Sequence, residues 1–279
     1  MSFISKKKYF TNRLPNGFGS FYLAKTIHFT ASGLLGIFTP IVAGVIIIHF
    51  GFSILFLIVI ILLLLSGIPF RTIPPAHEKY TWSYKKTWQQ FFAKKNRGLI
   101  VPLFADGAEN IIGLAVWPIF IFEILNGSYL EVGAVSTFII GATIIVQLST
   151  GKYIDQKTQK GGVIKLSSIF YSFGWVLKIF VVTAFHIFAV GVYHSVMRIF
   201  MRTSFDTLVY EIAADQGHYI DEFTTLREIT INMGKVLTLG VVILVSFYVP
   251  IVWAFAFAAA ASLVLNMLSS KHIVLESKS

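Results

Sequence analysis

Two acidic residues stand three positions apart in a long apolar stretch, FADGAENIIGLAVWPIF. At that spacing Asp106 and Glu109 share one face of a helix, and Asn110 lies beside them. A charged side chain inside a membrane helix is costly and usually faces a bundle interior or a wet cavity. The group is therefore a candidate for a substrate or proton path. The alternative is that both acids lie near one end of their helix and pair with Lys or Arg.

A second row of polar residues lies further along the chain, in VYHSVMRIFMRTSFDTLVYEIAADQ. Arg198 and Arg202 are four residues apart, and His194 and Asp206 extend the row by one turn each way. The other faces of this helix carry Val, Ile, Phe and Met. Such a row could bind an anionic substrate or pair with the two acids described above. Alternatively, Arg202 and Asp206 reach the membrane interface by snorkelling.

The elements that must position these rows are membrane helices. The mean hydropathy is +0.75, and 56% of the residues are apolar while 13% are charged. A soluble domain has about 45–50% apolar and about 25% charged residues. The apolar residues come in runs near the ~20 that a helix needs to cross ~30 Å of hydrocarbon. We predict an all-α, polytopic membrane protein.

We expect about eight membrane-spanning helices. Their ranges are 29–49, 52–70, 99–125, 130–150, 163–184, 187–207, 229–248 and 250–268. The third is long and contains two prolines, Pro102 and Pro118, with glycines between them, so we expect a kink or a steep tilt. The rest of the chain divides into a basic N-terminal segment, 1–28, a linker, 71–98, and a tail, 269–279.

The basic residues are distributed unequally between the two sides of these spans. The tight connections HFGFS, NGSYLE, AFHI and FYVP contain no Lys or Arg, whereas the tails and longer loops carry most of them. Cytoplasmic loops are enriched in Lys and Arg, so we expect both tails in the cytoplasm. Lys178 lies towards the opposite side, where we expect it to snorkel outward. The alternative is a functional role.

The linker before the third span has the pattern of a helix on a membrane surface. Residues 71–97 contain seven basic residues and one acidic residue. An aromatic stripe at helical spacing is flanked by lysines 85, 86, 94 and 95, and it consists of Tyr84, Trp88, Phe91 and Phe92. This pattern favours an amphipathic helix on an anionic inner leaflet. A disordered basic linker is the alternative.

Several other classes of function find no support in the sequence. There is no cysteine, and HExxH, GxSxG, P-loop and dinucleotide-binding patterns are missing. We therefore expect no enzyme activity, no metal and no cofactor. The net charge of +10 does not indicate nucleic acid, because in a membrane chain the position of the charges matters more than their sum. No cleavable signal peptide is visible at the start.

The connection GKYIDQKTQKGG resembles the cytoplasmic loop motif of the major facilitator superfamily, of general form G-x-L-x-D-R-x-G-R-[KR]. Its glycine, acidic and basic positions are occupied by Gly151, Asp155, Lys157 and Lys160. The sequence departs from the motif at Tyr153, Gln156 and Thr158. Such a degenerate form is usual for the second copy of the motif, between the eighth and ninth helices of the family.

Counting from that loop aligns most of the chain with this family. The six spans within 99–268 resemble its C-terminal half, and the two within 29–70 resemble its fifth and sixth helices. The helix-packing pattern of those two helices is supplied by Gly36, Pro40 and Gly44, small residues that allow close approach. The first four helices of the family have no counterpart here.

The resemblance implies secondary active transport of a small solute by alternating access, with a coupling proton as an option. In that fold the solute site lies at mid-membrane between two halves, and Asp155 with its lysines would form a cytoplasmic latch. The chain would then be a fragment, or a truncated form that associates with a missing half or another subunit. The alternative is a non-transporting scaffold or assembly partner. A bacterial inner membrane is the expected location.

Overall fold

The computed structural model describes residues 18–71, 80–154, 160–215 and 220–268. Within these ranges the regular elements are helices, and no strand occurs in them. The prediction of an all-helical membrane protein is confirmed by the long apolar helices described below. Gly151 lies within one helix and Lys160 begins the next, while Asp155 and Lys157 of the loop motif lie outside the described residues.

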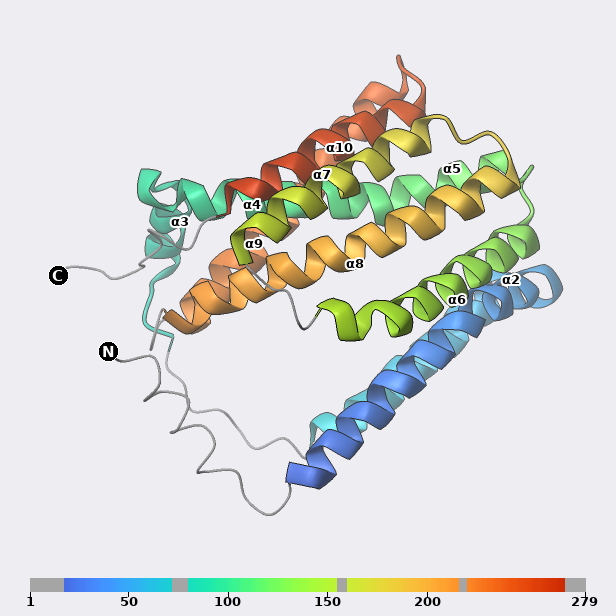
Figure 1. The fold of residues 1–279 in the computed structure, drawn as a ribbon, viewed down its shortest axis with the longest axis horizontal. Helices are drawn as coiled ribbons and strands as arrows, with labels where there is room; N and C mark the ends of the chain where they lie inside the picture. Colours follow the sequence, from blue (N-terminus) through green and yellow to red (C-terminus); the bar gives the residue numbers. More distant parts are fainter. Residues whose placement is uncertain (1–17, 72–79, 155–159, 216–219, 269–279) are drawn as a thin grey trace.

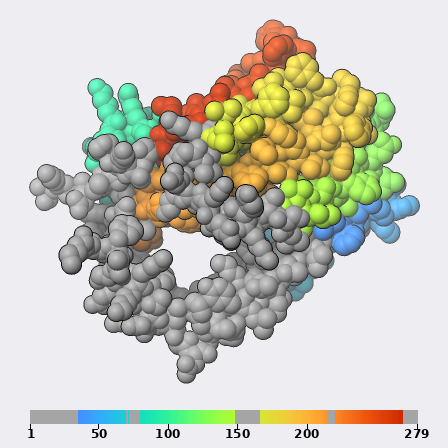
Figure 2. All heavy atoms as spheres, in the orientation of Figure 1, coloured from blue at the N-terminus to red at the C-terminus, as the bar shows by residue number. Residues whose placement is uncertain are grey.

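Figure 1 shows the order of the helices along the chain. Their bounds are α2 Phe18–Phe70, α3 Tyr84–Phe92, α4 Arg97–Ile111, a π-helical segment Ile112–Val116, α5 Trp117–Ile124, α6 Tyr129–Ile154, α7 Lys160–Ile179, α8 Ala184–Asp215, α9 Ile220–Ser246 and α10 Ala254–Val264. Short 3₁₀ turns occur at Lys94–Asn96, Ile251–Trp253 and Leu265–Met267. In the space-filling view α7, α8 and α10 pack side by side over the visible face (Figure 2).

Helix α2 is a hairpin of two antiparallel arms rather than one rod. At Gly51, inside α2, the backbone takes φ 75° and ψ 174°, which are not helical values. The ribbon of α2 turns back on itself (Figure 1). A straight helix over the 35 apolar residues Leu35–Pro69 would be roughly 52 Å long, well beyond the ~30 Å of hydrocarbon. The reversal at Gly51 gives two arms that match the first two predicted spans.

Five helical stretches of the described residues are long and apolar enough to cross a membrane. They are Leu35–Pro69, Lys94–Ile124, Tyr129–Gln147, Ala184–Ala213 and Ile220–Ser246. Two shorter apolar helices, Leu166–Ile179 and Ile251–Met267, lie beside them. With the first stretch divided at Gly51, each predicted span has its own helical segment.

Three boundaries differ markedly from the sequence prediction. Helix α2 begins at Phe18, so part of the predicted N-terminal segment 1–28 is helical. Helix α8 continues to Asp215 and α9 begins at Ile220, so the segment between the predicted spans 187–207 and 229–248 is mostly helical. The first turn of α9 carries Asp221 and Glu222, and carboxylates there are favoured by the helix dipole. Glu222 is fully buried and accepts hydrogen bonds from the backbone N–H and the hydroxyl of Thr81, at 2.7 and 2.6 Å.

The third span is irregular in its middle, as its prolines and glycines predicted. Between α4 and α5 the helix widens into a π-helical segment, where the Trp117 N–H donates to the carbonyl of Ile112. Pro118 explains this widening, because proline has no N–H to donate and its ring clashes with the carbonyl four residues earlier. Such π segments occur frequently at functional sites.

The core lies between α4, α7, α8, α9 and α10. Its largest fully buried side chains are Trp175, Tyr171, Phe205, Phe223 and Phe255. The outer faces of the helices are apolar instead of charged, as on α2 from Leu57 to Leu65. An exposed apolar surface of that extent marks a membrane-facing region.

Glycines set the closest helix contacts. On α4 and α9, a Cβ added at Gly107 would collide with the Ile231 carbonyl, and one added at Gly234 would collide with the Phe104 carbonyl. Small residues at such positions let two backbones approach. Helix α4 is therefore held directly against α9.

The first two spans pack on α6 in a similar way. An added Cβ at Gly44 would lie 2.7 Å from the Tyr129 carbonyl oxygen, and one at Gly133 would lie 2.5 Å from the Pro40 carbonyl oxygen. The predicted packing role therefore fits Gly44 and Pro40. At Gly36 an added Cβ meets no described atom within 4 Å, so the close approach does not extend to this glycine.

Two glycines of α9 provide a matched test of this packing. Gly234→Ala should destabilise the protein by about 1–3 kcal/mol through overpacking against α4. Gly240→Ala should stabilise it slightly, because an added Cβ there meets no described atom within 4 Å and alanine favours a helix by roughly 0.5–1 kcal/mol. Thermal unfolding of the two variants in detergent measures both effects. Equal unfolding midpoints would contradict the close contact.

Candidate functional site

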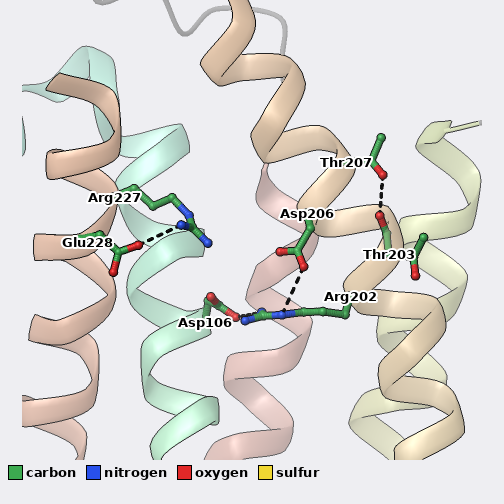
Figure 3. Close-up of polar contacts among 7 residues, drawn as sticks. All are labelled: Asp106, Arg202, Thr203, Asp206, Thr207, Arg227 and Glu228. Atoms are coloured by element: carbon green, nitrogen blue, oxygen red, sulfur yellow. Dashed lines mark hydrogen bonds and ion pairs between the residues drawn. The ribbon is translucent and has the colours of Figure 1, made fainter. Parts of the chain in front are cut away.

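A buried ion pair joins α4 to α8. The carboxylate of Asp106, 1% exposed, pairs with the guanidinium of Arg202, which reaches across from α8 (Figure 3). The Arg202 Nε also lies 3.7 Å from an oxygen of Asp206 on its own helix. Of the two readings of this row, the structure supports pairing with the acids of α4. Arg202 turns into the bundle, although 29% of its side chain stays exposed.

Arg227 of α9 extends this charged cluster. Its Nη1 lies 2.9 Å from an oxygen of Glu228, and its side chain points into the space between α9 and α8 (Figure 3). Its buried Nε has no hydrogen-bond partner among the described residues. Sequence reasoning missed this residue because it placed the start of the helix at residue 229.

Glu109 lies about one turn further along α4 and is also 1% exposed. The hydroxyl of Tyr171 on α7 donates a hydrogen bond of 2.7 Å to its Oε2. Its Oε1 is buried and has no hydrogen-bond partner among the described residues. A buried polar atom of this kind requires an explanation, such as a bound water, an ion or a functional role.

That carboxylate faces a cavity of about 110 Å³ between α4, α7 and α8. Six of its lining residues carry polar or charged groups that matter here: Glu109, Asn110, Tyr171, Lys178, His194 and Arg198. Four of the six site candidates selected from the sequence therefore line one cavity. The other two, Asp106 and Arg202, form the ion pair described above.

Lys178 lies inside the bundle, which corrects the prediction that it snorkels outward. Its side chain is 2% exposed, and its ammonium lies 3.8 Å from the ring centroid of Trp175 and 4.3 Å from that of Trp117. A cation over an aromatic face is attracted by the ring quadrupole, more strongly when it is desolvated. These two indoles therefore stabilise an ammonium at the cavity wall.

His194 is packed between aromatic rings of α7. Its ring centroid lies 4.6 Å from that of Tyr171 and 4.5 Å from that of Trp175. An added Cβ at Gly174 would come within 2.9 Å of the His194 Nδ1, so a glycine is needed opposite this histidine. The buried Nδ1 has no hydrogen-bond partner among the described residues.

Sequence reasoning missed the contribution of α7. Tyr171, Trp175 and Lys178 occur at i, i+4 and i+7 in YSFGWVLK, the spacing of one helical face. This signal was available in the sequence. It was overlooked because Lys178 was expected to reach the membrane surface, so Tyr171 and Trp175 on the same helical face were not considered.

The buried ion pair can be tested by comparing single and double substitutions. Arg202→Gln leaves the Asp106 carboxylate buried without its partner, a change that costs up to about 3–5 kcal/mol. The double variant Asp106→Asn/Arg202→Gln should recover part of that loss. As a control, Glu228→Gln breaks a more exposed pair, worth about 0–1 kcal/mol. A double variant no more stable than Arg202→Gln, measured by thermal unfolding, would contradict the pairing.

Comparison with models of known protein families and with curated protein sequences finds no match. The relation to the major facilitator superfamily therefore stays a resemblance of loop motif, helix order and helix-packing pattern. The function has to be argued from the cavity itself.

Proposed function

We propose that this protein is a secondary transporter and that the cavity between α4, α7 and α8 binds a small anionic solute. The observation that carries the proposal is a set of charged side chains around a cavity inside apolar membrane helices. Ionisable residues in such a position are expensive, and they typically mark substrate, ion or proton pathways.

The balance of charge at the cavity favours an anion. Its walls carry two cations, Lys178 and Arg198, and one carboxylate, Glu109. The carboxylate already accepts a hydrogen bond from Tyr171. Arg198 is exposed and also lines the cavity, where its guanidinium can bind a solute. A carboxylate or phosphate group would compensate the excess positive charge through charge-assisted hydrogen bonds.

Glu109 is the residue we propose for a coupling proton. Charge at this depth is costly, and the Oε1 atom of Glu109 has no hydrogen-bond partner among the described residues. When no cation lies close enough to compensate the charge of Glu109, proton uptake by its carboxylate would remove the cost of burying that charge. Movement of Lys178 or of a solute would then change the free energy of protonating Glu109. A transport cycle requires this kind of coupling between solute and proton.

A scaffold function is the alternative from another class. A scaffold needs the fold alone, and it gives no reason to place Lys178 and Glu109 around a cavity. For location we propose a bacterial inner membrane with both tails in the cytoplasm, since the basic residues gather on the side of the long loops.

The proposal can be tested by ligand-induced stabilisation of the purified full chain. Phosphate, acetate, succinate and glutamate are compared with glucose and lysine as neutral and cationic solutes. At least one anion should raise the unfolding midpoint of the wild type, because a ligand that binds only the folded state stabilises it. The same anion should exchange across proteoliposomes containing the protein.

Charge-removing variants locate the effect. Lys178→Met and Arg198→Gln should lose the anion-induced shift and the exchange, since each removes a cation from the cavity wall. Lys235→Met on α9 removes a lysine that does not line the cavity and should keep both. A shift caused only by neutral or cationic solutes, or an unchanged anion effect in Lys178→Met, would contradict the proposal.

A further inference from the structure

Helix α3 lies at the end of the bundle where α4 and α9 begin, and it projects from that end in the space-filling view (Figures 1 and 2). The Oγ of Ser83 caps it by accepting a hydrogen bond of 3.3 Å from the Lys86 N–H. One face of the helix packs on the protein through Thr87 and Phe91, which are 4% and 9% exposed. The amphipathic helix predicted from the linker sequence is therefore present.

The four aromatic residues predicted to form one stripe do not all lie on the same face of α3, however. Phe91 turns inward, whereas Tyr84 and Phe92 are 80% and 70% exposed. Trp88 is half-buried between them, with ring centroids 6.2 Å from Tyr84 and 6.1 Å from Phe92. Three aromatic rings thus form an outward row at i, i+4 and i+8. The row borders an open groove that also includes Lys85 and Gln89.

The charges around this row have one sign. Residues 80–97 contain five basic residues and no acidic residue. Lys85, Lys94 and Lys95 are exposed, while Lys86 lies over the ring of Trp82 at 5.9 Å. A surface that combines exposed aromatic rings with lysines is complementary to the headgroup region of an anionic leaflet.

Hydrogen bonds on both sides of α3 hold it in place within the protein itself. Thr81 is bound to the buried Glu222 of α9 by two hydrogen bonds, at 2.7 and 2.6 Å. After the helix, the Nδ2 of Asn96 donates a hydrogen bond of 2.8 Å to the Gln90 carbonyl. The aromatic row is therefore presented on a rigid support, directly beside the point where α4 enters the apolar bundle.

We propose that α3 is a preorganised membrane anchor that inserts Tyr84, Trp88 and Phe92 into an anionic leaflet. The location favours a lipid surface over a soluble partner, because the row lies at the end of membrane-spanning helices, where headgroups must be close. The neighbouring lysines hold the headgroup phosphates. This inference does not depend on the proposed solute.

The absence of cysteine from the chain allows a direct test with single labels. Tyr84→Cys carries an environment-sensitive NBD dye in the full chain, reconstituted into nanodiscs of phosphatidylcholine with or without phosphatidylglycerol. Asp221→Cys, at an exposed position on the first turn of α9, is the matched control. Both positions are exposed, so the substitutions leave the core intact.

With phosphatidylglycerol present, the Tyr84→Cys dye should shift its emission to shorter wavelength and be quenched by brominated lipid, while the control dye stays in water. Replacing Lys85, Lys94 and Lys95 with Gln should reduce both the emission shift and the quenching, because each lysine near an anionic surface contributes about 1 kcal/mol of attraction. A dye at Tyr84→Cys that remains as water-exposed as the control would overturn the anchor. Equal insertion without phosphatidylglycerol, or after loss of the lysines, would overturn the anionic requirement.

Discussion

The structure depends on the burial of two carboxylates in one membrane helix. Asp106 and Glu109 are each 1% exposed, in surroundings where an unpaired charge costs several kcal/mol. Their compensation must come from other helices. Arg202 of α8 pairs with the first carboxylate, and Tyr171 of α7 donates to the second. These two links connect α8 and α7 to α4.

The second carboxylate differs from the first because its compensation is incomplete. Two basic residues also line the cavity, Lys178 and Arg198. The lysine lies over two indole rings, and the arginine is exposed. The π-helical segment after Ile111 lies beside this region. The segment ends directly before Trp117, whose ring lies under the Lys178 ammonium. A fully satisfied core would pair these groups with one another, whereas here they line a cavity.

Local spacing explains how much of this could be predicted from the sequence. The acids of α4 and the row from His194 to Asp206 share helical faces, so periodicity identified them as site candidates. Periodicity could not predict that Lys178 is buried, because its position over two indole rings depends on how α7 packs against the third span. The start of α9 was placed too late because Glu222 reads as a loop residue until its partner Thr81, far away in the sequence, is known.

The central claim is that the cavity is a water-accessible site within the membrane. Asn110 lines it, whereas Phe173 is 51% exposed on the outer side of α7, two residues from Trp175. The most direct measurement is the reaction of single cysteines at these two positions with a charged methanethiosulfonate reagent in proteoliposomes. The account predicts that Asn110→Cys reacts and that Phe173→Cys, facing lipid, does not. An unreactive Asn110→Cys, or equal reaction at both positions, would contradict it.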